Sequence, residues 1–222
     1  PLDPPGQPGA GSGLLSASDA VERAVLRRFA QAWQRADLPV AAGQATRSWV
    51  WGPSAFAVGR EPYAETHAGT RAVAYFDKAR LELTDPDKPP SDPWSVTSGL
   101  LAKELITGLE QVGNATFRPH QPAAVPVAGD PDDPNGPTYA TLAAVLGAPP
   151  SGEGETIVQT IDRAGRIGSD ERLAQYDVRA GPLVPETGHR IASVFWDFLQ
   201  QEDVVYEAGG FTTDRLFWPL FA

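Results

Sequence analysis

The chain has 222 residues, no cysteine and a formal net charge of −10 at pH 7. The lack of cysteine excludes disulfides, thiolate metal sites and a cysteine nucleophile. The negative charge argues against nucleic-acid binding through phosphate contacts. No apolar run is long enough to span a membrane. An apolar share of 41% suffices for a hydrophobic core, whereas 22 glycines and 22 prolines predict many turns and long irregular connections.

The N-terminal residues 1–15 have the composition of a flexible tether. They are rich in proline and glycine, and Asp3 is their one charged side chain. Such a segment cannot bury enough apolar surface to fold, although an ordinary frayed terminus has the same composition. A tether of this kind often follows a cleaved signal peptide, and the absence of methionine and cysteine suits an oxidising or hot exterior. We therefore expect an extracellular or cell-surface protein of thermophile type.

The clearest predicted element is an amphipathic helix near the start of the chain. Ser16 or Ser18 can cap it, and it is expected to end near Asp37, ahead of Pro39. Four apolar residues that recur at every fourth position form its buried face: Val21, Val25, Phe29 and Trp33.

Residues 44–83 are predicted to form β-structure. The segment 47–51 alternates and places two tryptophans on one face. The segment 71–83 is the strongest strand region in the chain, and a bend near Asp77 or Lys78 would divide it into two strands.

The remaining predicted elements are shorter. Apolar stripes bounded by glycine or proline predict helices at 96–107, 138–146, 170–175 and 186–201. Strands are expected at 155–161 and in a hairpin made of 204–206 and 211–213. Together these elements predict an α+β fold, in which a modest antiparallel sheet packs with three or more amphipathic helices and the loops are long and rich in proline and glycine.

Turn-forming residues around 122–137 mark a candidate domain boundary. We accordingly expect a tether at 1–15, an N-terminal α+β unit at 16–120 and a C-terminal α+β unit at 121–222, which could be continuous with the first. The chain ends on an apolar segment that would tend to associate with other apolar surfaces if it were exposed to solvent. Its residues are the expected interface: Leu216, Phe217, Trp218, Leu220 and Phe221. This end either packs into the core, docks on a partner or continues beyond residue 222 in the native chain.

One acidic loop is a candidate for a bound cation. It offers four oxygen donors within six residues: Asp130, Asp132, Asp133 and Asn135. Calcium prefers about six to eight such oxygens on a flexible loop, but the spacing differs from that of an EF-hand loop and the same residues are common in plain turns. We favour the plain turn, and calcium is the one cofactor that the sequence leaves open.

No recognised nucleophile motif is present, so carboxylates are the candidates for chemistry. A glycoside hydrolase needs two carboxyl groups at a defined separation, and with 28 acidic residues some pair always looks plausible. The candidate carboxylates are Asp77 and Glu65; Asp77 is either an ordinary surface residue or a buried carboxylate paired with an arginine such as Arg47 or Arg71. The three histidines match no zinc-site spacing and are expected to serve in capping or packing: His67, His120 and His189.

Exposed tryptophans would suit sugar binding, because the faces of sugar rings stack on indole groups. The candidates for such a binding platform are Trp49, Trp51 and Trp94. Most tryptophans in folded proteins are largely buried, which favours a role in the core for these three. A polysaccharide therefore ranks below a protein as the expected partner.

Several short segments, in the order in which they occur along the chain, resemble segments of a family of secreted or cell-surface proteins from Chloroflexota, many of which come from thermophiles. The phrases that carry the resemblance are Phe-Ala-Gln-Ala-Trp at 29–33, Trp-Val-Trp-Gly-Pro at 49–53, Glu-Pro-Tyr-Ala-Glu at 61–65, Val-Ala-Tyr-Phe-Asp-Lys-Ala-Arg-Leu-Glu at 73–82, Val-Thr-Ser-Gly-Leu-Leu at 96–101, Glu-Leu-Ile-Thr-Gly at 104–108, Ala-Gly-Asp-Pro-Asp-Asp-Pro-Asn-Gly-Pro-Thr-Tyr-Ala at 128–140 and Ile-Ala-Ser-Val-Phe-Trp-Asp-Phe at 191–198. The resemblance covers 20–222 and implies no activity and no catalytic residue, because none is assigned in that family. In similar sequences the chain continues past 216–221 into a second aromatic-rich half.

Three functions follow, in decreasing order of support. The first is a non-enzymatic structural or assembly protein of the cell surface (a component of a surface layer, matrix or filament), whose partner is a copy of itself or another surface protein. The second is a secreted glycan or cell-wall hydrolase, and the third is a carbohydrate-binding module. Neither nucleic acid nor a membrane span is expected in any of the three.

Overall fold

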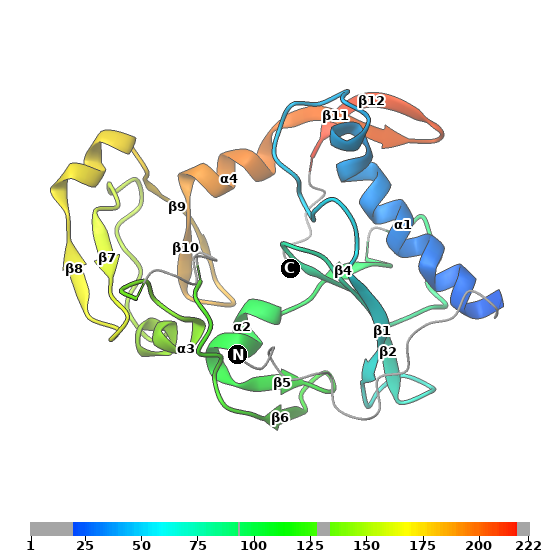
Figure 1. The fold of residues 1–222 in the computed structure, drawn as a ribbon, viewed down its shortest axis with the longest axis horizontal. Coiled ribbons are helices and arrows are strands. Elements are labelled where there is room, and N and C mark those ends of the chain that lie inside the picture. The colour runs from blue at the N-terminus through cyan, green and yellow to red at the C-terminus, as the bar shows by residue number, and fades with distance from the viewer. Residues whose placement is uncertain (1–19, 93, 128–133, 217–222) are drawn as a thin grey trace. The chain divides into compact units, whose positions relative to one another are not determined.

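The computed structural model describes residues 20–92, 94–127 and 134–216. These residues form antiparallel strand pairs and several helices (Figure 1), so the α+β class predicted from the sequence is confirmed. The chain divides into two compact units. Within the described residues, unit 1 comprises 20–101, 110–118 and 202–216, and unit 2 comprises 102–109 and 119–201.

Unit 1 begins with α1 (Ala20–Ala41), the amphipathic helix that the apolar stripe predicts. Val25 and Phe29 of that stripe are buried. The prediction that the helix ends near Asp37 is wrong, because the helix continues through Pro39. Both residues are fully buried, and the carbonyl oxygen of Pro39 accepts backbone hydrogen bonds from the following loop. Packing therefore keeps the last turn helical although proline lacks an N–H donor.

Unit 1 contains a four-stranded antiparallel sheet in which each strand pairs with the next along the chain. Its strands are β1 (Ala57–Pro62), β2 (Thr70–Tyr75), β3 (Arg80–Leu83) and β4 (Thr97–Ser98). The chain turns between β2 and β3 at Asp77 and Lys78, which confirms the bend predicted within 71–83.

Residues 47–51 form no strand, contrary to the sequence prediction. The buried carboxylate of Asp37 accepts hydrogen bonds from the backbone N–H groups of Val50, Trp51 and Gly52, at 2.7, 2.7 and 3.1 Å. Because a side chain of α1 already engages these donors, the segment cannot use them to pair with a strand.

The two faces of the sheet differ in chemistry, because side chains alternate along each strand. One face carries the buried apolar residues Ala72, Ala74, Leu81 and Leu83. The opposite face carries four charged residues from three strands: Glu61, Arg71, Arg80 and Glu82. The register of the strands thus gathers these charged residues on one face, which also carries the buried Val73.

The C-terminal hairpin also belongs to unit 1, where α1 packs against its first strand (Figure 1). β11 (Glu202–Glu207) and β12 (Gly210–Arg215) pair in register around Ala208 and Gly209, both of which have positive φ. This is the hairpin that the sequence predicts at its glycine turn. Val205 of β11 is completely buried, so the hairpin contributes to the core.

Unit 2 is built from short elements. Its helices are α2 (Leu101–Thr107), α3 (Tyr139–Leu142) followed by the 3-10 turn η1 (Ala143–Val145), the 3-10 helix η2 (Glu171–Tyr176) and α4 (Ser193–Gln200). Its strand pairs are β7 (Gln159–Ile161) with β8 (Ile167–Ser169), and β9 (Ala180–Val184) with β10 (His189–Ala192). A further pair, β5 (Leu109–Gln111) with β6 (Phe117–Pro119), has its outer residues in unit 2 and its inner residues in unit 1.

Two predicted helices are shorter than the sequence indicates. The segment 96–107 is helical only from Leu101, and the segment 186–201 is helical only from Ser193. His189–Ala192 forms β10 instead, because its backbone pairs with β9 in an antiparallel register. Pairing with β9 therefore overrides the local helical pattern. The apolar stripe by itself gives no sign of this pairing.

The units differ in how much apolar surface they bury. Among the described residues fifteen apolar side chains other than proline are buried, and all but Ala180 belong to unit 1. The described part of unit 2 exposes large apolar side chains on its strands and helices: Ile167, Tyr176, Leu183, Val194 and Phe195. In the part of the chain that the structure describes, no helix has the length and apolarity needed to cross a membrane.

Candidate functional site

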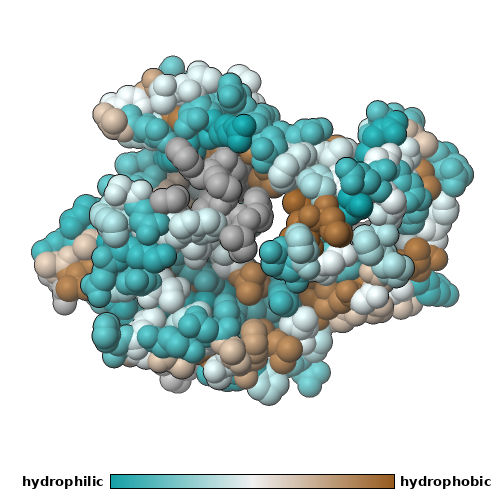
Figure 2. Space-filling view, turned by 180° about the vertical axis from the view of Figure 1, so that it is seen from behind, coloured by the Kyte–Doolittle hydropathy of each residue, from teal (hydrophilic) through white to brown (hydrophobic). Residues whose placement is uncertain are grey.

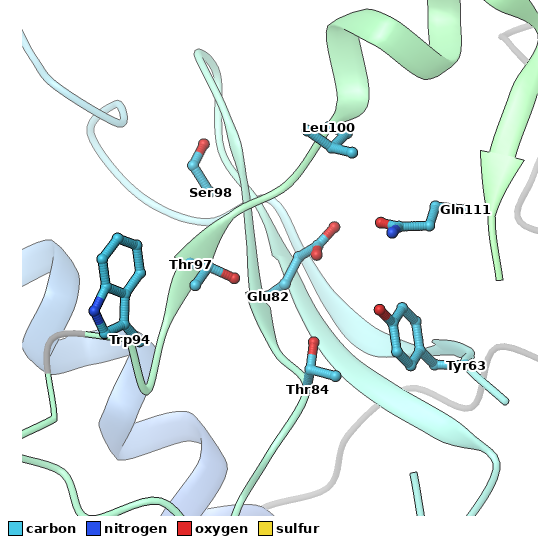
Figure 3. Close-up of a pocket in the computed structure, with 8 residues that line it drawn as sticks. All are labelled: Tyr63, Glu82, Thr84, Trp94, Thr97, Ser98, Leu100 and Gln111. Atoms are coloured by element: carbon cyan, nitrogen blue, oxygen red, sulfur yellow. The ribbon is translucent and has the colours of Figure 1, made fainter. Parts of the chain in front are cut away.

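A cleft of about 340 Å³ opens on the charged face of the sheet in unit 1 (Figure 3). Its lining includes two aromatic residues and four polar ones: Tyr63, Trp94, Glu82, Thr84, Thr97 and Gln111. An adjoining hollow shares part of this lining and adds Asp85 and Lys88. This cleft is the candidate functional site.

Glu82 of the lining belongs to a group of four charged residues, here called the arginine–glutamate cluster: Glu61, Arg71, Arg80 and Glu82. Glu82 Oε2 lies 2.8 Å from Arg71 Nη1, and Glu82 Oε1 lies 2.7 Å from Arg80 Nη2. Glu61 Oε2 lies 3.7 Å and 3.6 Å from the guanidinium groups of Arg71 and Arg80. Two guanidinium groups thus face two carboxylates, so the formal charges cancel. Both arginines are almost completely buried, which makes the loss of any one member costly.

Two tyrosines border the cluster. Tyr75 Oη donates a hydrogen bond to Glu61, and burial together with that hydrogen bond raises the pKa of Tyr75 to about 12. The Arg71 guanidinium lies 4.8 Å from the ring centre of Tyr63, a cation–π distance. Tyr63 Oη donates to Asn114 Oδ1 at 2.8 Å, and burial raises the pKa of Tyr63 as well. Both phenols therefore stay protonated and act as hydrogen-bond donors at neutral pH.

Gly99 lets the backbone approach the cluster closely. Its N–H donates to the carbonyl oxygen of Arg80 at 2.7 Å. A Cβ atom at this position would lie 2.7 Å from Arg80 Nε and closer still to Glu82 Oε1. Only glycine leaves enough space at this position, and the backbone of Gly99 therefore packs directly on the paired side chains of Arg80 and Glu82.

The lining of the cleft consists mainly of neutral polar groups and aromatic rings. Glu82 is held by two arginines, so its carboxylate is a hydrogen-bond acceptor of fixed orientation. The other polar lining groups are the hydroxyls of Tyr63, Thr84, Thr97 and Ser98 and the amide of Gln111. Hydroxyls and an amide between aromatic rings are the groups that bind uncharged polar ligands.

The three tryptophans predicted as a sugar platform lie in different environments. Trp94 lines the cleft with 37% of its surface exposed, and its backbone N–H donates to Asp92 Oδ1 at 2.8 Å. Trp51 is buried and Trp49 is half-buried in the loop that follows α1. Neither of these two lines the cleft, so the three tryptophans do not form a single row along it.

The candidate carboxylates lie apart from each other and from the lining of the cleft. Asp77 is exposed in the turn between β2 and β3. Glu65 lies in the loop between β1 and β2, where its carboxylate accepts a hydrogen bond from the Asn114 N–H at 2.9 Å. The interpretation of Asp77 as a buried partner of Arg47 or Arg71 is wrong, because Asp77 is exposed and these arginines pair with other carboxylates.

The buried carboxylates that face those arginines are Asp37 and Glu82. Arg47 Nη1 lies 3.8 Å from Asp37 Oδ1, and Arg47 Nε lies 3.2 Å from Asp203 Oδ2. Burial lowers the pKa of Arg47, while the two carboxylates oppose that shift. The sequence did not identify Asp37 or Glu82 as the partner of either arginine. A signal was present for Glu82, which is charged within an apolar strand segment, but its partners depend on strand register.

The remaining predicted site residues fall mostly outside the described ranges. Asp130, Asp132 and Asp133 of the cation loop lie there, while the carbonyl oxygen of Asn135 accepts a hydrogen bond from the Arg163 N–H at 3.0 Å. Within 20–92, 94–127 and 134–216, no group of three histidine, aspartate or glutamate side chains could hold a metal ion.

The predicted C-terminal interface is described only at its first residue. Leu216 is buried, and its carbonyl oxygen accepts a hydrogen bond from Arg35 Nη1 at 3.0 Å. The other interface residues lie outside the described part: Phe217, Trp218, Leu220 and Phe221. At Leu216 the chain therefore still belongs to the core of unit 1.

Comparison with known proteins gives no relative from which a function could be transferred. No protein-family model matches the chain, and neither a curated protein nor a solved structure matches it. The function has to be argued from the units and the cleft themselves.

Proposed function

We propose that this chain is a non-catalytic extracellular or cell-surface protein that acts by assembling with other chains in a surface layer, matrix or filament. The observation that carries the proposal is the poor core of unit 2. Ala180 is its one buried apolar residue among those described, whereas large apolar side chains remain in solvent. Figure 2 shows hydrophobic patches set among hydrophilic surface. Exposed apolar surface of this kind is stabilised when a partner covers it.

Helix α4 is the strongest example of such a surface. None of its residues is buried, although its sequence is strongly apolar. Val194 is 50% exposed and Phe195 is 66% exposed. We propose that assembly covers this helix, which then becomes one of the three or more packed amphipathic helices that the sequence predicts. Covering two such side chains would contribute about 2–4 kcal/mol to association.

The proposed partner is a second copy of this chain, and another surface protein is the alternative outcome. The location outside the cell and the thermophile character rest on the composition and on the resemblance to secreted Chloroflexota proteins. The absence of cysteine and methionine and the many prolines are consistent with both.

The alternative of a secreted glycan or cell-wall hydrolase has less support. The cleft carboxylate Glu82 and its neighbour Glu61 both face arginines. Asp77 and Glu65 lie in two separate turns outside the lining of the cleft. A hydrolase of this class needs one carboxyl group with a raised pKa that faces a second one across the substrate.

Sedimentation velocity over a range of concentrations tests the assembly proposal. We expect the chain to associate at micromolar concentration, and the double variant Val194→Ser/Phe195→Ser to weaken association by about tenfold or more, a loss of at least about 1.4 kcal/mol. Phe56→Ser is the matched control, because Phe56 is also highly exposed but lies in unit 1. A chain that stays monomeric at about 100 μM, or that associates equally well in both variants, would contradict the proposal.

A further inference from the structure

We infer that the cleft of unit 1 binds an uncharged sugar ring, with the indole of Trp94 as its stacking surface. This goes beyond assembly, because the cleft and the apolar surface of unit 2 are separate features of the chain. The inference rests on the lining of the cleft, its charge and its rigidity.

The lining combines an aromatic surface with hydrogen-bonding groups. Figure 3 shows Trp94 and Tyr63 at opposite ends of the cleft, with Thr97, Glu82 and Thr84 between them. A sugar ring presents an apolar C–H face and an equatorial rim of hydroxyls. The apolar face is suited to the partly exposed indole of Trp94, and the hydroxyls are suited to side chains that both donate and accept hydrogen bonds.

The charge of the cleft favours an uncharged ligand. Glu82 is the acidic residue of the lining, and it is paired at 2.8 and 2.7 Å with Arg71 and Arg80. An anionic ligand would meet the carboxylate of Glu82, and a cationic ligand would compete with two buried arginines for it. A neutral hydroxyl can hydrogen-bond beside the carboxylate without disturbing either ion pair.

The size and rigidity of the cleft fit a single ring. Its volume of about 340 Å³ is at the lower end of the range of small-molecule sites, roughly 300–1,000 Å³. Arg71, Arg80 and Gly99 hold Glu82 in place before any ligand arrives. A preformed site loses little conformational entropy on binding, which allows weak but selective binding through one aromatic group.

NMR titration of the full chain tests this inference. The ¹⁵N-labelled protein is titrated with cellohexaose, xylohexaose and mannohexaose, and the indole N–H signals of its six tryptophans are followed. We expect the Trp94 signal to shift with at least one of the three sugars. Trp94→Ala should weaken binding about tenfold or more, and Trp94→Phe should restore part of it, because stacking needs an aromatic face.

Trp49→Phe is the matched control, since Trp49 lies in the same unit but outside the cleft, and it should bind as the wild type does. Thr97→Val keeps the indole and removes one hydroxyl, and it should weaken binding by a smaller factor. The inference is overturned if no indole signal shifts at about 10 mM of any of the three sugars. It is also overturned if Trp94→Ala binds as tightly as the wild type, or if hexagalacturonate, an anionic sugar, binds better than the neutral ones.

Discussion

Unit 1 and unit 2 are folded from one chain, yet they are stabilised in different ways. Unit 1 has a helix, a four-stranded sheet and a hairpin around a common apolar core, and it also buries three charged residues on one face of the sheet, Arg71, Arg80 and Glu82. Unit 2 has two-stranded pairs and short helices, with almost no apolar side chain buried among the described residues. The difference teaches that a compact unit with regular secondary structure need not bury many apolar side chains.

The strongest test of this contrast compares two phenylalanines. Phe29 of α1 is 3% exposed and Phe195 of α4 is 66% exposed. We expect Phe29→Ala to lower the free energy of unfolding by about 4 kcal/mol, because it leaves a cavity in the core. Phe195→Ala should change it by less than about 0.5 kcal/mol in dilute solution. Urea denaturation followed by circular dichroism measures both values, and equal losses would refute the contrast.

The next test asks how much of the stability of unit 1 depends on buried charge. Glu82→Gln removes the central carboxylate of the arginine–glutamate cluster and leaves two buried guanidinium groups without it, so we expect a loss of about 3 kcal/mol. Glu110→Gln is the matched control, because Glu110 pairs at 2.6 Å with Arg118, whose side chain is half exposed. That change should reduce stability by less than about 1 kcal/mol. A smaller loss for Glu82→Gln than for the control would show that the cluster is dispensable.

The smallest expected effect concerns alkaline pH. The folded protein raises the pKa of Tyr75 from 10.0 to about 12, through burial and the hydrogen bond to Glu61. The unfolded chain therefore loses this proton first, so the contribution of Tyr75 to stability is complete below pH 10 and falls as pH rises toward 12. Tyr75→Phe should flatten the decline in stability over this range, as measured by urea denaturation at a series of pH values. A decline as steep as that of the wild type would exclude Tyr75 as its cause.

Part of the fold could be predicted because it is encoded locally. The four-residue spacing of apolar side chains locates α1, the bend at Asp77 and Lys78 separates β2 from β3, and the glycine turn marks the β11–β12 hairpin. Each of these signals lies within a few residues of the element that it predicts. The α+β class follows from their sum.

The site could be predicted only in part, because its residues depend on contacts between distant segments. Trp94 was a candidate for sugar binding among three tryptophans, and only the fold distinguishes it from the buried Trp51. Among the acidic residues of this segment, the sequence favours Asp77 over Glu82, because Asp77 interrupts an apolar strand. Strand register, not local sequence, decides which carboxylate is buried beside which arginine.

The sequence by itself determined the class of fold, the long helix and the two best hairpins, since periodicity and turn chemistry act over neighbouring residues. The tertiary structure alone decided three features. The Asp37 carboxylate accepts hydrogen bonds from the backbone of residues 50–52, His189–Ala192 becomes a strand, and Glu82 lies between two arginines. The physical reason is the same in each case. A buried polar group must find its partner, and that partner is brought to it only when the chain has folded.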